Sequence, residues 1–527
     1  MQLIIPMSGL GERFLKVGYK VPKPLIYVEE KPIIAHIVDM FPGVESIFFI
    51  CNKNHLLSKD LKMRETLLKI KPNSKIISID QHKKGPIHAV LSSINYFDLE
   101  KPTIVNYCDF NCIWDYNKFS QYVRDSKCDG CVVTYKGFHP HMLVNTNYAY
   151  LKVNNSNITD IQEKKPFTSK PMDEHASSGT YYFKTGALMD KYFNKTVKED
   201  LHVNGEYYVS MSFKPMIKDN LNLRVFNLRF FMQWGTPEDL KDYEWYSNMF
   251  KKKLNHNKKK EIIQNTTLLI PCAGIGSRFV KEGYKKPKPF IKVSGKIMLL
   301  QAINDLPLCH NTKVIFRNDM DDLNISIYKL KKYFPKIEIK LLNKKTDGQA
   351  ITCLEGLDKN NMNSSLIISA CDNGLIYSKN FLNLIKDNSI DIVVWGCRRY
   401  PGAIKKPEMY GWIDEEYGKI KKIHVKKQSK DKFNDPIITG TFYFRESSIF
   451  QKITFDLIKG GKKVNNEFYI DSCINNAINL GYSVRYFEVD YFLCWGTPDD
   501  LKTYKYWQEC FNDWDCHDYK KSLDEDF

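Results

Sequence analysis

Residues 3–24 read LIIPMSGLGERFLKVGYKVPKP, and residues 268–289 read LLIPCAGIGSRFVKEGYKKPKP. Each stretch begins with a short apolar run of the kind that forms a buried parallel strand, and it continues into a glycine-rich loop. A loop of this type lets backbone amides approach phosphate oxygens without a side chain between them, and a helix start after it favours negative charge. The two stretches therefore predict two phosphate-binding loops, each at the end of a central strand.

The repeated order of motifs continues to the end of each half. The later pairs are Cys108-Asp109 with Cys371-Asp372, Gly179-Thr180 with Gly440-Thr441, Asn204-x-Glu206 with Asn465-x-Glu467, and Trp234-Gly235-Thr236-Pro237 with Trp495-Gly496-Thr497-Pro498. The offset between the copies falls only from 265 residues at Gly9 and Gly274 to 261 at Gly235 and Gly496. So constant an offset predicts a duplicated domain. We expect a first domain over residues 1–248, a basic linker over 249–265 and a second domain over 266–527.

The composition is that of an ordinary globular protein with material for two cores. Of the 527 residues, 43% are hydrophobic and 26% are charged. The 14 cysteines are scattered, and the chain runs from Met1 directly into the first expected strand, so we expect a reducing, cytoplasmic setting and no signal peptide. No apolar run approaches the roughly 18 residues of a membrane span, which predicts no membrane segment.

The formal net charge of +17 is compatible with nucleic acid, a membrane surface or small anionic substrates as partners. Part of this charge lies in two lysine triplets, at residues 251–253 and 258–260. No zinc, homeodomain or RNA-binding motif accompanies them, so we interpret them as a solvated linker or helix end and expect no nucleic-acid partner.

The strand pattern predicts an α/β fold in each half. Apolar runs at residues 104–107 and 366–369 read as strands that place Asp109 and Asp372 at their carboxyl ends. Helical stretches between such strands favour a Rossmann-like, mixed but mostly parallel sheet covered on both faces, with ligands beyond the carboxyl ends. Residues 148–161 and 410–423 are typical of hairpins, which would wall the open side of each pocket.

The glycine loop differs from the two best-known phosphate loops. The dinucleotide fingerprint requires a third glycine where this chain has Phe14 and Phe279, and no Gly-Lys-Ser/Thr occurs. Instead, an arginine follows two residues after the second glycine, Arg13 in one copy and Arg278 in the other, and a lysine lies between prolines, Lys23 and Lys288. Arginine offers a planar fork for a pyrophosphate, and lysine offers a compact charge for a phosphoryl group under attack.

With these motifs the chain resembles the nucleotidyltransferases that make nucleotide-activated sugars, also called sugar-nucleotide pyrophosphorylases. The resemblance rests on Gly-x-Gly-x-Arg-Phe, Tyr-x-x-Pro-Lys-Pro, Asn-Gly-Glu-Tyr-Tyr and Trp-Gly-Thr-Pro-Glu-Asp, and it is strongest to the branch found in capsule and surface-polysaccharide clusters. It covers both halves apart from the linker and the tail after about Tyr506. It implies two nucleotide-diphospho-sugar transferase domains that join a nucleoside triphosphate to a phosphorylated sugar, polyol or related small molecule and release pyrophosphate.

The resemblance also assigns a magnesium site. Nucleotidyl transfer usually needs Mg²⁺ held by carboxylates, and Asp109 and Asp372 match the metal aspartate of the family, although on pattern alone a helix cap is an equal alternative. The family commonly has a second metal aspartate, and Gln233 and Cys494 stand in its place here. Two alternatives are left open: one carboxylate and the substrate phosphates suffice, or a second ligand comes from Glu238, Asp239, Asp490, Asp499 or Asp500.

The acceptor site is likewise assigned by resemblance. Glu206 and Glu467 match the acceptor-binding glutamate, and Gly179 and Gly440 would allow close backbone approach to the same ligand. Glu163-Lys164 resembles a pair that holds acceptor and phosphate. The second half has Lys426-Lys427 there, a difference that would allow the halves to take different acceptors.

The nucleotide site is expected to differ between the halves. Its predicted residues are Gly9, Gly11, Gly274, Gly276, Ser277 and Gln349. Gln349 resembles the family's reader of a pyrimidine edge, which favours CTP or UTP with CTP slightly ahead, whereas the first half has Pro86 at this place. The first half also has Glu12 where the second has Ser277, and a carboxylate beside a triphosphate needs a compensating cation. We expect catalysis in the second half foremost and favour activity in the first.

Two other functions remain open. A regulatory protein could bind nucleotide without turnover, and a glycosyltransferase could share the related fold. The glycosyltransferase hypothesis predicts an Asp-x-Asp motif at the strand end. Cys371-Asp372-Asn373 and Cys108-Asp109-Phe110 lack the second aspartate of that motif. The acceptor, the base, the second metal ligand and the oligomeric state are left open by the sequence.

Overall fold

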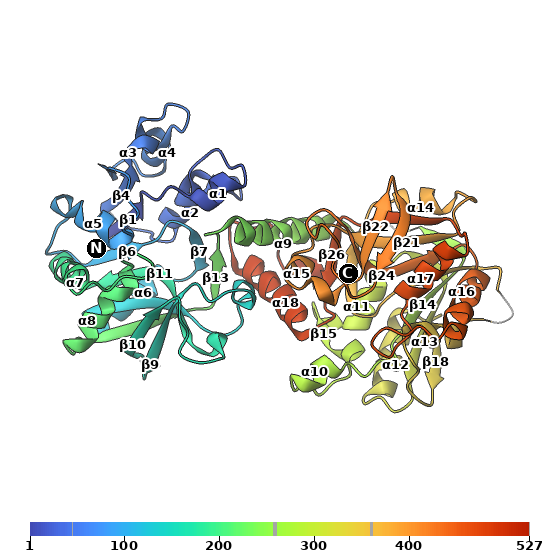
Figure 1. Ribbon diagram of the computed structural model, residues 1–527. Helices are drawn as coiled ribbons and strands as arrows, with labels where there is room; N and C mark the ends of the chain where they lie inside the picture. The colour runs from blue at the N-terminus through green and yellow to red at the C-terminus, as the bar shows by residue number, and fades with distance from the viewer. Residues whose placement is uncertain (45, 257–260, 359–361, 526–527) are drawn as a thin grey trace. The chain divides into compact units, whose positions relative to one another are not determined.

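The computed structural model describes residues 1–44, 46–256, 261–358 and 362–525, and it divides into two compact units (Figure 1). The first comprises Met1–Glu244 with Asp513–His517, and the second comprises Trp245–Asn512 with Asp518–Phe527. The predicted linker, 249–265, overlaps the end of α9 (Pro237–His256) and the start of β14 (Ile262–Pro271), and its residues 257–260 lie outside the described residues. The predicted boundary at residue 248 thus stands four residues beyond the boundary between the units.

The first unit is built on a nine-stranded sheet with the order β5-β4-β1-β6-β11-β8-β12-β10-β9. The pairs β1–β4, β1–β6, β4–β5 and β8–β12 are parallel, whereas β11 runs antiparallel to β6 and β8, and β9 and β10 form a hairpin. The strands are β1 (Gln2–Met7), β4 (Ser46–Asn52), β5 (Lys75–Ile79), β6 (Thr103–Asn106), β8 (Gly130–Tyr135), β9 (Ala149–Asn154), β10 (Asn157–Glu163), β11 (His175–Phe183) and β12 (Leu223–Leu228).

The second unit has a sheet with the corresponding strand order, β18-β17-β14-β19-β24-β21-β25-β23-β22. Its strands after β14 are β17 (Leu308–Arg317), β18 (Glu338–Leu342), β19 (Ser365–Ile368), β21 (Ile392–Cys397), β22 (Trp412–Glu416), β23 (Lys419–His424), β24 (Ile437–Phe444) and β25 (Val484–Glu488). Parallel and antiparallel pairs also correspond, with β24 antiparallel to β19 and β21. The predicted fold class, two mixed α/β domains, is confirmed.

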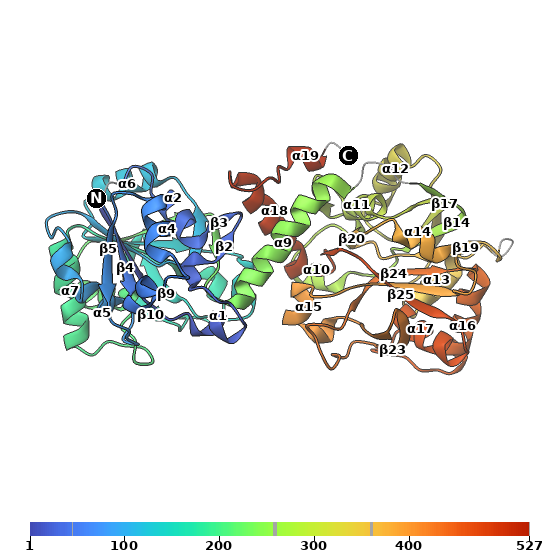
Figure 2. The ribbon, with the colours of Figure 1, turned by 90° about the horizontal axis from the view of Figure 1, so that it is seen from above.

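Helices cover both faces of each sheet, as Figure 2 shows for the second unit. Successive residues of β14 explain this burial: Leu268 and Ile270 pack in one apolar cluster with α11 and α12, and Leu269 packs in another with α13, α16 and α17. A strand buried on both faces reads as a continuous apolar run, which is why the sequence revealed it. The helices here are α11 (Met298–Asp305), α12 (Leu323–Tyr333), α13 (Gln349–Gly356), α14 (Asn380–Ile385), α15 (Pro401–Lys405), α16 (Ser447–Lys459), α17 (Ile470–Asn479), α18 (Pro498–Asp513) and α19 (Ser522–Glu525).

In the first unit, α5, α7 and α8 contribute to the apolar cluster on one face, and Phe119 of α6 packs against Tyr182 on the other. The helices are α1 (Glu12–Lys16), α2 (Ile33–Asp39), α3 (Lys53–Leu57), α4 (Met63–Ile70), α5 (Pro86–Leu91), α6 (Tyr116–Asp125), α7 (Gly186–Lys198) and α8 (Phe213–Lys218), followed by α9. In the part of the chain that the structure describes, no helix combines the length and apolar character of a membrane span.

In the described residues, four two-stranded ribbons complete the units. The ribbons β2 (Tyr27–Val28) with β3 (Lys31–Pro32) and β15 (Lys292–Val293) with β16 (Lys296–Ile297) follow the lysine motifs. The other two pair β7 (Phe110–Ile113) with β13 (Phe230–Gln233), and β20 (Asn373–Ile376) with β26 (Tyr491–Cys494). These last two ribbons bring each Cys-Asp pair next to its Trp-Gly-Thr-Pro motif, an association that the sequence reading did not predict.

Candidate active sites

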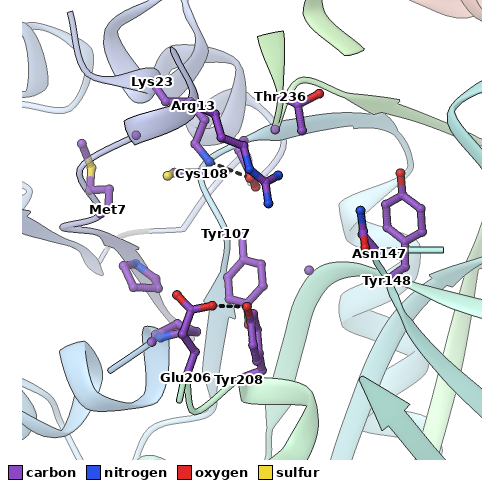
Figure 3. A pocket seen from close by; sticks show the side chains of 18 of the residues that line it. Met7, Arg13, Lys23, Tyr107, Cys108, Asn147, Tyr148, Glu206, Tyr208 and Thr236 are labelled. Atoms are coloured by element: carbon purple, nitrogen blue, oxygen red, sulfur yellow. Dashed lines mark hydrogen bonds and ion pairs between the residues drawn. The ribbon is translucent and has the colours of Figure 1, made fainter. Parts of the chain in front are cut away.

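Each unit has a cavity beyond the carboxyl ends of its central strands. The first has a volume of about 800 Å³ and the second about 230 Å³. Figure 3 shows the first cavity, with Arg13 and Lys23 on one side and Glu206 and Tyr208 on the other. The placement agrees with the rule that ligands of such sheets lie at the carboxyl ends of the strands.

Most of the predicted site residues line these cavities. In the first unit they are Gly9, Gly11, Arg13, Lys23, Asp109, Glu163, Lys164, Gly179 and Glu206. In the second unit they are Gly274, Gly276, Lys288, Gln349, Asp372 and Glu467. Ser277, Arg278 and Gly440 do not line the smaller cavity, although the positive charge of Arg278 acts on Lys426, whose pKa burial chiefly lowers. Arg278 is exposed, so it lies at the edge of the site.

The two glycines of each loop have different structural roles. Gly11 and Gly276 adopt left-handed φ angles of 66° and 68°, and a Cβ on Gly276 would lie 3.0 Å from the Cβ of Lys288. Glycine is therefore required there by conformation and by the approach of the lysine. A Cβ on Gly9 or Gly274 would meet nothing within 4 Å. The space beside this first glycine is open to a ligand.

The helices after the loops are shorter than the phosphate-binding interpretation assumes. α1 and α10 (Ser277–Lys281) have five residues each, and neither has a side-chain N-cap. Because a helix dipole is the sum of aligned peptide dipoles, so short a helix contributes little. The negative charge of a bound phosphate would therefore be stabilised mainly by the backbone amides of the loop and by the arginine and lysine side chains.

The predicted catalytic lysine forms an ion pair with the predicted metal aspartate in each unit. Lys23 Nζ lies 2.8 Å from Asp109 Oδ2, and Lys288 pairs in the same way with Asp372. Burial lowers the pKa of Lys23, but the charge of Asp109, supported by Cys108 and the hydrogen bond, outweighs it, so the pKa lies above its ordinary value. The pKa of Lys288 is raised against its burial by Asp372. Both lysines are therefore fixed positive charges.

The Trp-Gly-Thr-Pro motif holds the aspartate in place. The Trp234 amide donates to the Asp109 carbonyl at 3.0 Å, and the Trp495 amide does so to Asp372 at 2.8 Å. A Cβ on Gly235 would lie 2.9 Å from Asp109 Oδ2, and one on Gly496 would lie 3.1 Å from the corresponding oxygen. The glycine of this motif therefore leaves room for the carboxylate, a role that the sequence reading missed.

The other candidate metal ligands have structural partners. The Thr236 and Thr497 hydroxyls donate to Asp239 and Asp500 at 2.8 and 2.6 Å, and the threonines accept from the backbone amides of these aspartates, as a helix N-cap does. Asp490 pairs with Lys252 and Asp499 pairs with Lys406, while Glu238 is exposed on the first turn of α9.

The carboxylates fit magnesium only in combination with a substrate. Among the described residues, no group of three His, Cys, Asp or Glu side chains could hold a metal ion without other ligands. Magnesium is commonly bound by one or two carboxylates together with phosphate oxygens and waters. Asp109 and Asp372 fit that mode, because each supplies one carboxylate next to the open side of a glycine loop.

The acceptor glutamates are presented by tight turns. Val203 bridges Glu206, and Val464 bridges Glu467, around two central residues that all have positive φ: Asn204 at 53°, Gly205 at 79°, Asn465 at 49° and Asn466 at 62°. Asn and Gly are the residues that tolerate this conformation best. The turn explains why an Asn-x-Glu spacing recurs in both halves.

Backbone hydrogen bonds join this turn to the loop that carries Pro86 or Gln349. In the first unit, the Tyr207 amide donates to the Lys84 carbonyl at 2.9 Å, and the Ile87 amide donates to the Tyr207 carbonyl at 3.1 Å. Phe468 has the same two bonds, with Asp347 and Ala350. The predicted base side and acceptor side of each cavity are therefore mechanically linked, which no local sequence signal indicated.

Tyr208 is a site residue that the sequence reading missed. Its hydroxyl accepts a hydrogen bond from Lys164 Nζ at 2.5 Å and donates one to Glu206. The lysine also lies 4.4 Å from the centre of the tyrosine ring. In the second unit Tyr469 makes the corresponding bond with Glu467, which contributes, after burial, to its raised pKa. The recurrence of Tyr two residues after Glu was the available signal.

The structure corrects the alignment of the Glu163-Lys164 pair. Lys164 and Lys426 are equivalent, since each ends its hairpin with a left-handed φ, 57° and 51°. The counterpart of Glu163 is therefore Val425, and Lys426-Lys427 does not replace the pair as predicted. Glu163 accepts a hydrogen bond from the Ser210 hydroxyl at 2.6 Å, and burial, with a contribution from Glu206, raises its pKa to about 6.

Glu12 has the compensating cation that its position requires. Its carboxylate forms an ion pair with Lys83 at 2.6 Å, across the mouth of the first cavity. In the second unit the two positions are occupied by Ser277 and Thr346, which are both neutral. At these two positions the first unit therefore has an ion pair, and the second unit has two uncharged side chains.

The first half of the chain is similar to a known family. Residues 3–220 match the family model described as Nucleotidyl transferase. This range includes the glycine loop, Lys23, Asp109 and the turn that presents Glu206. The match supports the predicted family for this half, whereas the half expected to be the more active lies outside it. No curated protein is significantly similar to the chain.

Several solved structures are similar over nearly half of this chain. The nucleoside-diphosphate-sugar pyrophosphorylase from Vibrio cholerae is 19% identical over 46% of this chain and 98% of its own, with a TM-score of 0.36. The inositol-1-phosphate CTP transferase from T. maritima is 14% identical over 46% and 95%, with a TM-score of 0.37. A UDP-glucose pyrophosphorylase complexed with UDP-glucose is 19% identical over 45% and 94%, with a TM-score of 0.37.

Proposed function

We propose that the chain is a nucleotidyltransferase that joins a nucleoside triphosphate to a phosphorylated sugar, polyol or related small molecule and releases pyrophosphate. The observation that carries this proposal is the single cavity that holds a glycine loop and the Lys23–Asp109 pair at one end and Glu206 at the other. Cations at one end suit a triphosphate, and hydrogen-bond acceptors at the other suit the hydroxyls of a second substrate. The match of residues 3–220 to the nucleotidyl transferase model supports the same chemistry.

In the proposed reaction a phosphate oxygen of the acceptor attacks the α-phosphorus in line. The new oxygen–phosphorus bond forms as the bond to the β-phosphate oxygen breaks, and pyrophosphate leaves with the electron pair. Arg13 and Arg278 would bind the leaving pyrophosphate, and Lys23 and Lys288 would bind the reacting phosphates. Such catalysis consists of positioning and charge neutralisation and needs no covalent enzyme intermediate.

Asp109 and Asp372 would have two roles. Without substrate each neutralises its lysine, so the lysine is held in one position and the carboxylate is not left as an unpaired, partly buried charge. With substrate, phosphate oxygens would compete for the lysine, and each carboxylate would hold Mg²⁺, which supplies further positive charge at the phosphates when bound.

The base and the biological role are finer parts of the proposal. Gln349 begins α13 and lines the second cavity, a position from which its amide would reach a pyrimidine edge, so we propose CTP or UTP, with CTP slightly ahead. Pro86 begins α5 at the corresponding place and offers no side-chain hydrogen bond. The resemblance to capsule-cluster enzymes favours a role in surface-polysaccharide precursor synthesis.

We propose activity in both halves. The second half has the glutamine, while the first has the larger cavity, the family match and a balanced Glu12–Lys83 pair in place of an unneutralised carboxylate. The Lys–Asp pair is present in both.

A pyrophosphate-release screen tests the proposal. CTP, UTP, ATP and GTP would be combined with a panel of phosphorylated acceptors, using wild type, Lys23→Ala, Lys288→Ala and the double variant. The matched controls are Lys20→Ala and Lys285→Ala, exposed lysines three residues earlier in the same motifs. We expect the double variant to lose release and the controls to keep it. Full turnover in the double variant would overturn the site assignment, and no release by wild type would favour the regulatory alternative.

A further inference from the structure

Hydroxyl groups line the acceptor end of the first cavity. They belong to Tyr107, which follows β6, and to Ser177, Ser178 and Tyr181 of β11. The Ser177 hydroxyl donates to the Tyr181 hydroxyl at 2.9 Å, and the Ser178 hydroxyl donates to the Val133 carbonyl at 3.0 Å. Hydroxyls can both donate and accept, so this wall can hydrogen-bond many hydroxyls of a ligand.

The equivalent positions of the second unit are largely apolar, and of these residues only Ala370 lines the second cavity. Tyr181 lies opposite Val105 and Val132, and Phe442 lies opposite Ile368 and Val394, the equivalent residues of the neighbouring strands. The same register places Ile438 at the position of Ser177 and Thr439 at that of Ser178, and Ala370 follows β19 as Tyr107 follows β6. Ile438 and Phe442 belong to a buried apolar cluster, as Tyr181 does in the first unit, but unlike Ser177 and Tyr181 they carry no hydroxyl.

The carboxylate near the hairpin lysine has also changed position. In the first unit Glu163 at the end of β10 accepts from Ser210, and Ala149 lies opposite it in the hairpin. In the second unit Val425 replaces the glutamate and packs on the apolar cluster, while Asp471 at the start of α17 takes the position of Ser210. The charge of Asp471 acts on Lys426.

A compensating change makes room for this aspartate. A Cβ on Gly411, the counterpart of Ala149, would lie 2.6 Å from Asp471 Oδ2 and 3.2 Å from the Ile438 side chain. Alanine at 411 would therefore clash with the aspartate. Three residues have therefore changed together between the units: Glu163, Ser210 and Ala149 correspond to Val425, Asp471 and Gly411. The second unit keeps one carboxylate near its lysine, but this carboxylate comes from α17 and not from the hairpin.

The first cavity, of about 800 Å³, is lined by all four hydroxyl-bearing residues, whereas the lining of the second, of about 230 Å³, includes only Ala370 of their counterparts. Apolar residues give a ligand hydroxyl no hydrogen-bond partner, so the equivalent positions of the second unit disfavour a ligand with many hydroxyls.

We infer that the two halves act on different acceptors. The first takes a polyhydroxylated acceptor phosphate, a sugar or polyol, and the second takes a smaller phosphate with few hydroxyls, so that one chain makes two different nucleotide conjugates. The inference rests on the proposed nucleotidyl transfer. In each half the same bond forms, between an acceptor phosphate oxygen and the α-phosphorus, and pyrophosphate leaves.

Single-site variants of the full chain separate the two activities. Lys288→Ala removes the lysine of the second site, so its activity reports on the first site. Lys23→Ala removes the lysine of the first site, so its activity reports on the second. The polyhydroxylated probes are glucose 1-phosphate and myo-inositol 1-phosphate, and the small probes are ethanolamine phosphate, serine phosphate and propanediol phosphate. We expect Lys288→Ala to release pyrophosphate with the first group and Lys23→Ala with the second.

A conservative substitution tests the wall itself. Tyr181→Phe, in the Lys288→Ala background, copies the second unit and should raise the KM for the polyhydroxylated probe about fivefold to tenfold, as expected for one lost hydrogen bond. In the Lys23→Ala background it should leave the KM for the small probe unchanged. A Tyr181→Phe variant with the same KM for the polyhydroxylated probe would count against the assigned wall.

Each result of the screen has a definite meaning. If Lys23→Ala and Lys288→Ala prefer the same acceptors, or if one of them abolishes all turnover, the two-acceptor inference is overturned while nucleotidyl transfer stands. If wild type releases no pyrophosphate with any triphosphate and probe, the proposed function itself fails.

Discussion

Lys23 Nζ lies 2.8 Å from Asp109 Oδ2, so the cation predicted to hold a phosphate is held by the carboxylate predicted to hold a metal. The same relationship joins Lys288 and Asp372. The charge of each lysine is thus neutralised before substrate arrives, and a triphosphate with its metal would have to exchange partners with both residues of the pair. This resting pair has consequences for stability as well as for catalysis.

Lys23→Ala should destabilise the first unit, because it leaves Asp109 without its cation at a site where only about a quarter of each side chain is exposed. We expect a loss of about 1–2 kcal/mol in the free energy of unfolding, between the values for exposed and fully buried pairs. Urea denaturation would measure it, with Lys20→Ala as control. The double variant Lys23→Ala/Asp109→Asn should recover part of the loss, and equal stability of Lys23→Ala and the control would contradict the prediction.

Gly235→Ala should inactivate the first site with little effect on folding elsewhere, because its Cβ would lie 2.9 Å from Asp109 Oδ2 and displace the carboxylate. We expect a fall in kcat of about tenfold or more for the Lys288→Ala background, since small misplacements at a reacting centre are costly. Gly460→Ala is the control, because its Cβ would make only an ordinary contact at 3.5 Å. A Gly235→Ala variant with unchanged turnover would show that the aspartate need not lie where the structure has it.

Glu163 should make the first unit less stable as the pH rises. Its folded pKa of about 6 lies above its ordinary value of 4.5, chiefly because of burial, so protonation is favoured in the folded state. The stability that this group contributes is fully present below pH 4.5 and is lost as the pH rises through 6. Relative to Glu163→Gln, wild type should lose about 2 kcal/mol of unfolding free energy over this window. Denaturation curves at several pH values would measure the difference, and a constant difference would contradict the raised pKa.

Tyr208→Phe should weaken acceptor binding in the first site. The lost hydroxyl accepts from Lys164 and donates to Glu206, so both side chains would lose a shared partner. We expect the acceptor KM to rise about tenfold, with a smaller change in kcat. Tyr207→Phe is a matched control, because the neighbouring hydroxyl bonds the exposed Asp200. The measurement belongs in the Lys288→Ala background, and an equal effect of the two substitutions would refute the role given to Tyr208.

The sequence predicts those parts of the site that local patterns encode. The first glycine loop, Lys23, Asp109 and Glu206 each stand beside a recognisable strand or turn, and the structure gathers all of them in one cavity. Long-range relationships have no such signature. The bonds from Tyr207 to the loop around Gly85 depend on two segments that are far apart in the chain, and so does the fit of Gly235 against Asp109.

The misplaced counterpart of Glu163 has a different cause. The prediction matched Glu163-Lys164 with Lys426-Lys427, although the first half also has two adjacent lysines, Lys164 and Lys165. The hairpin register and the left-handed φ of Lys164 and Lys426 fix the pairing. A shift by one residue moves every side chain of a strand to the opposite face. Charge type alone therefore could not identify which lysine faces the site.

Nucleotide affinity in the first site should depend on the balance between Glu12 and Lys83. Glu12→Ser leaves Lys83 free to attract a triphosphate, so it should tighten nucleotide binding. Lys83→Thr leaves Glu12 unneutralised and should weaken it. The double variant reproduces the Ser277 and Thr346 of the second unit and should bind much as wild type does. Because both side chains are largely exposed, we expect changes in Kd of only about twofold to fivefold, which high salt should abolish.

Titration calorimetry with CTP and magnesium, in the Lys288→Ala background at low and high salt, would measure these constants. The prediction requires opposite signs for the two single variants and a double variant whose Kd is close to that of wild type. Two single variants that both weaken binding, or effects that persist at high salt, would mean that the pair acts by shaping the loop rather than by its charge.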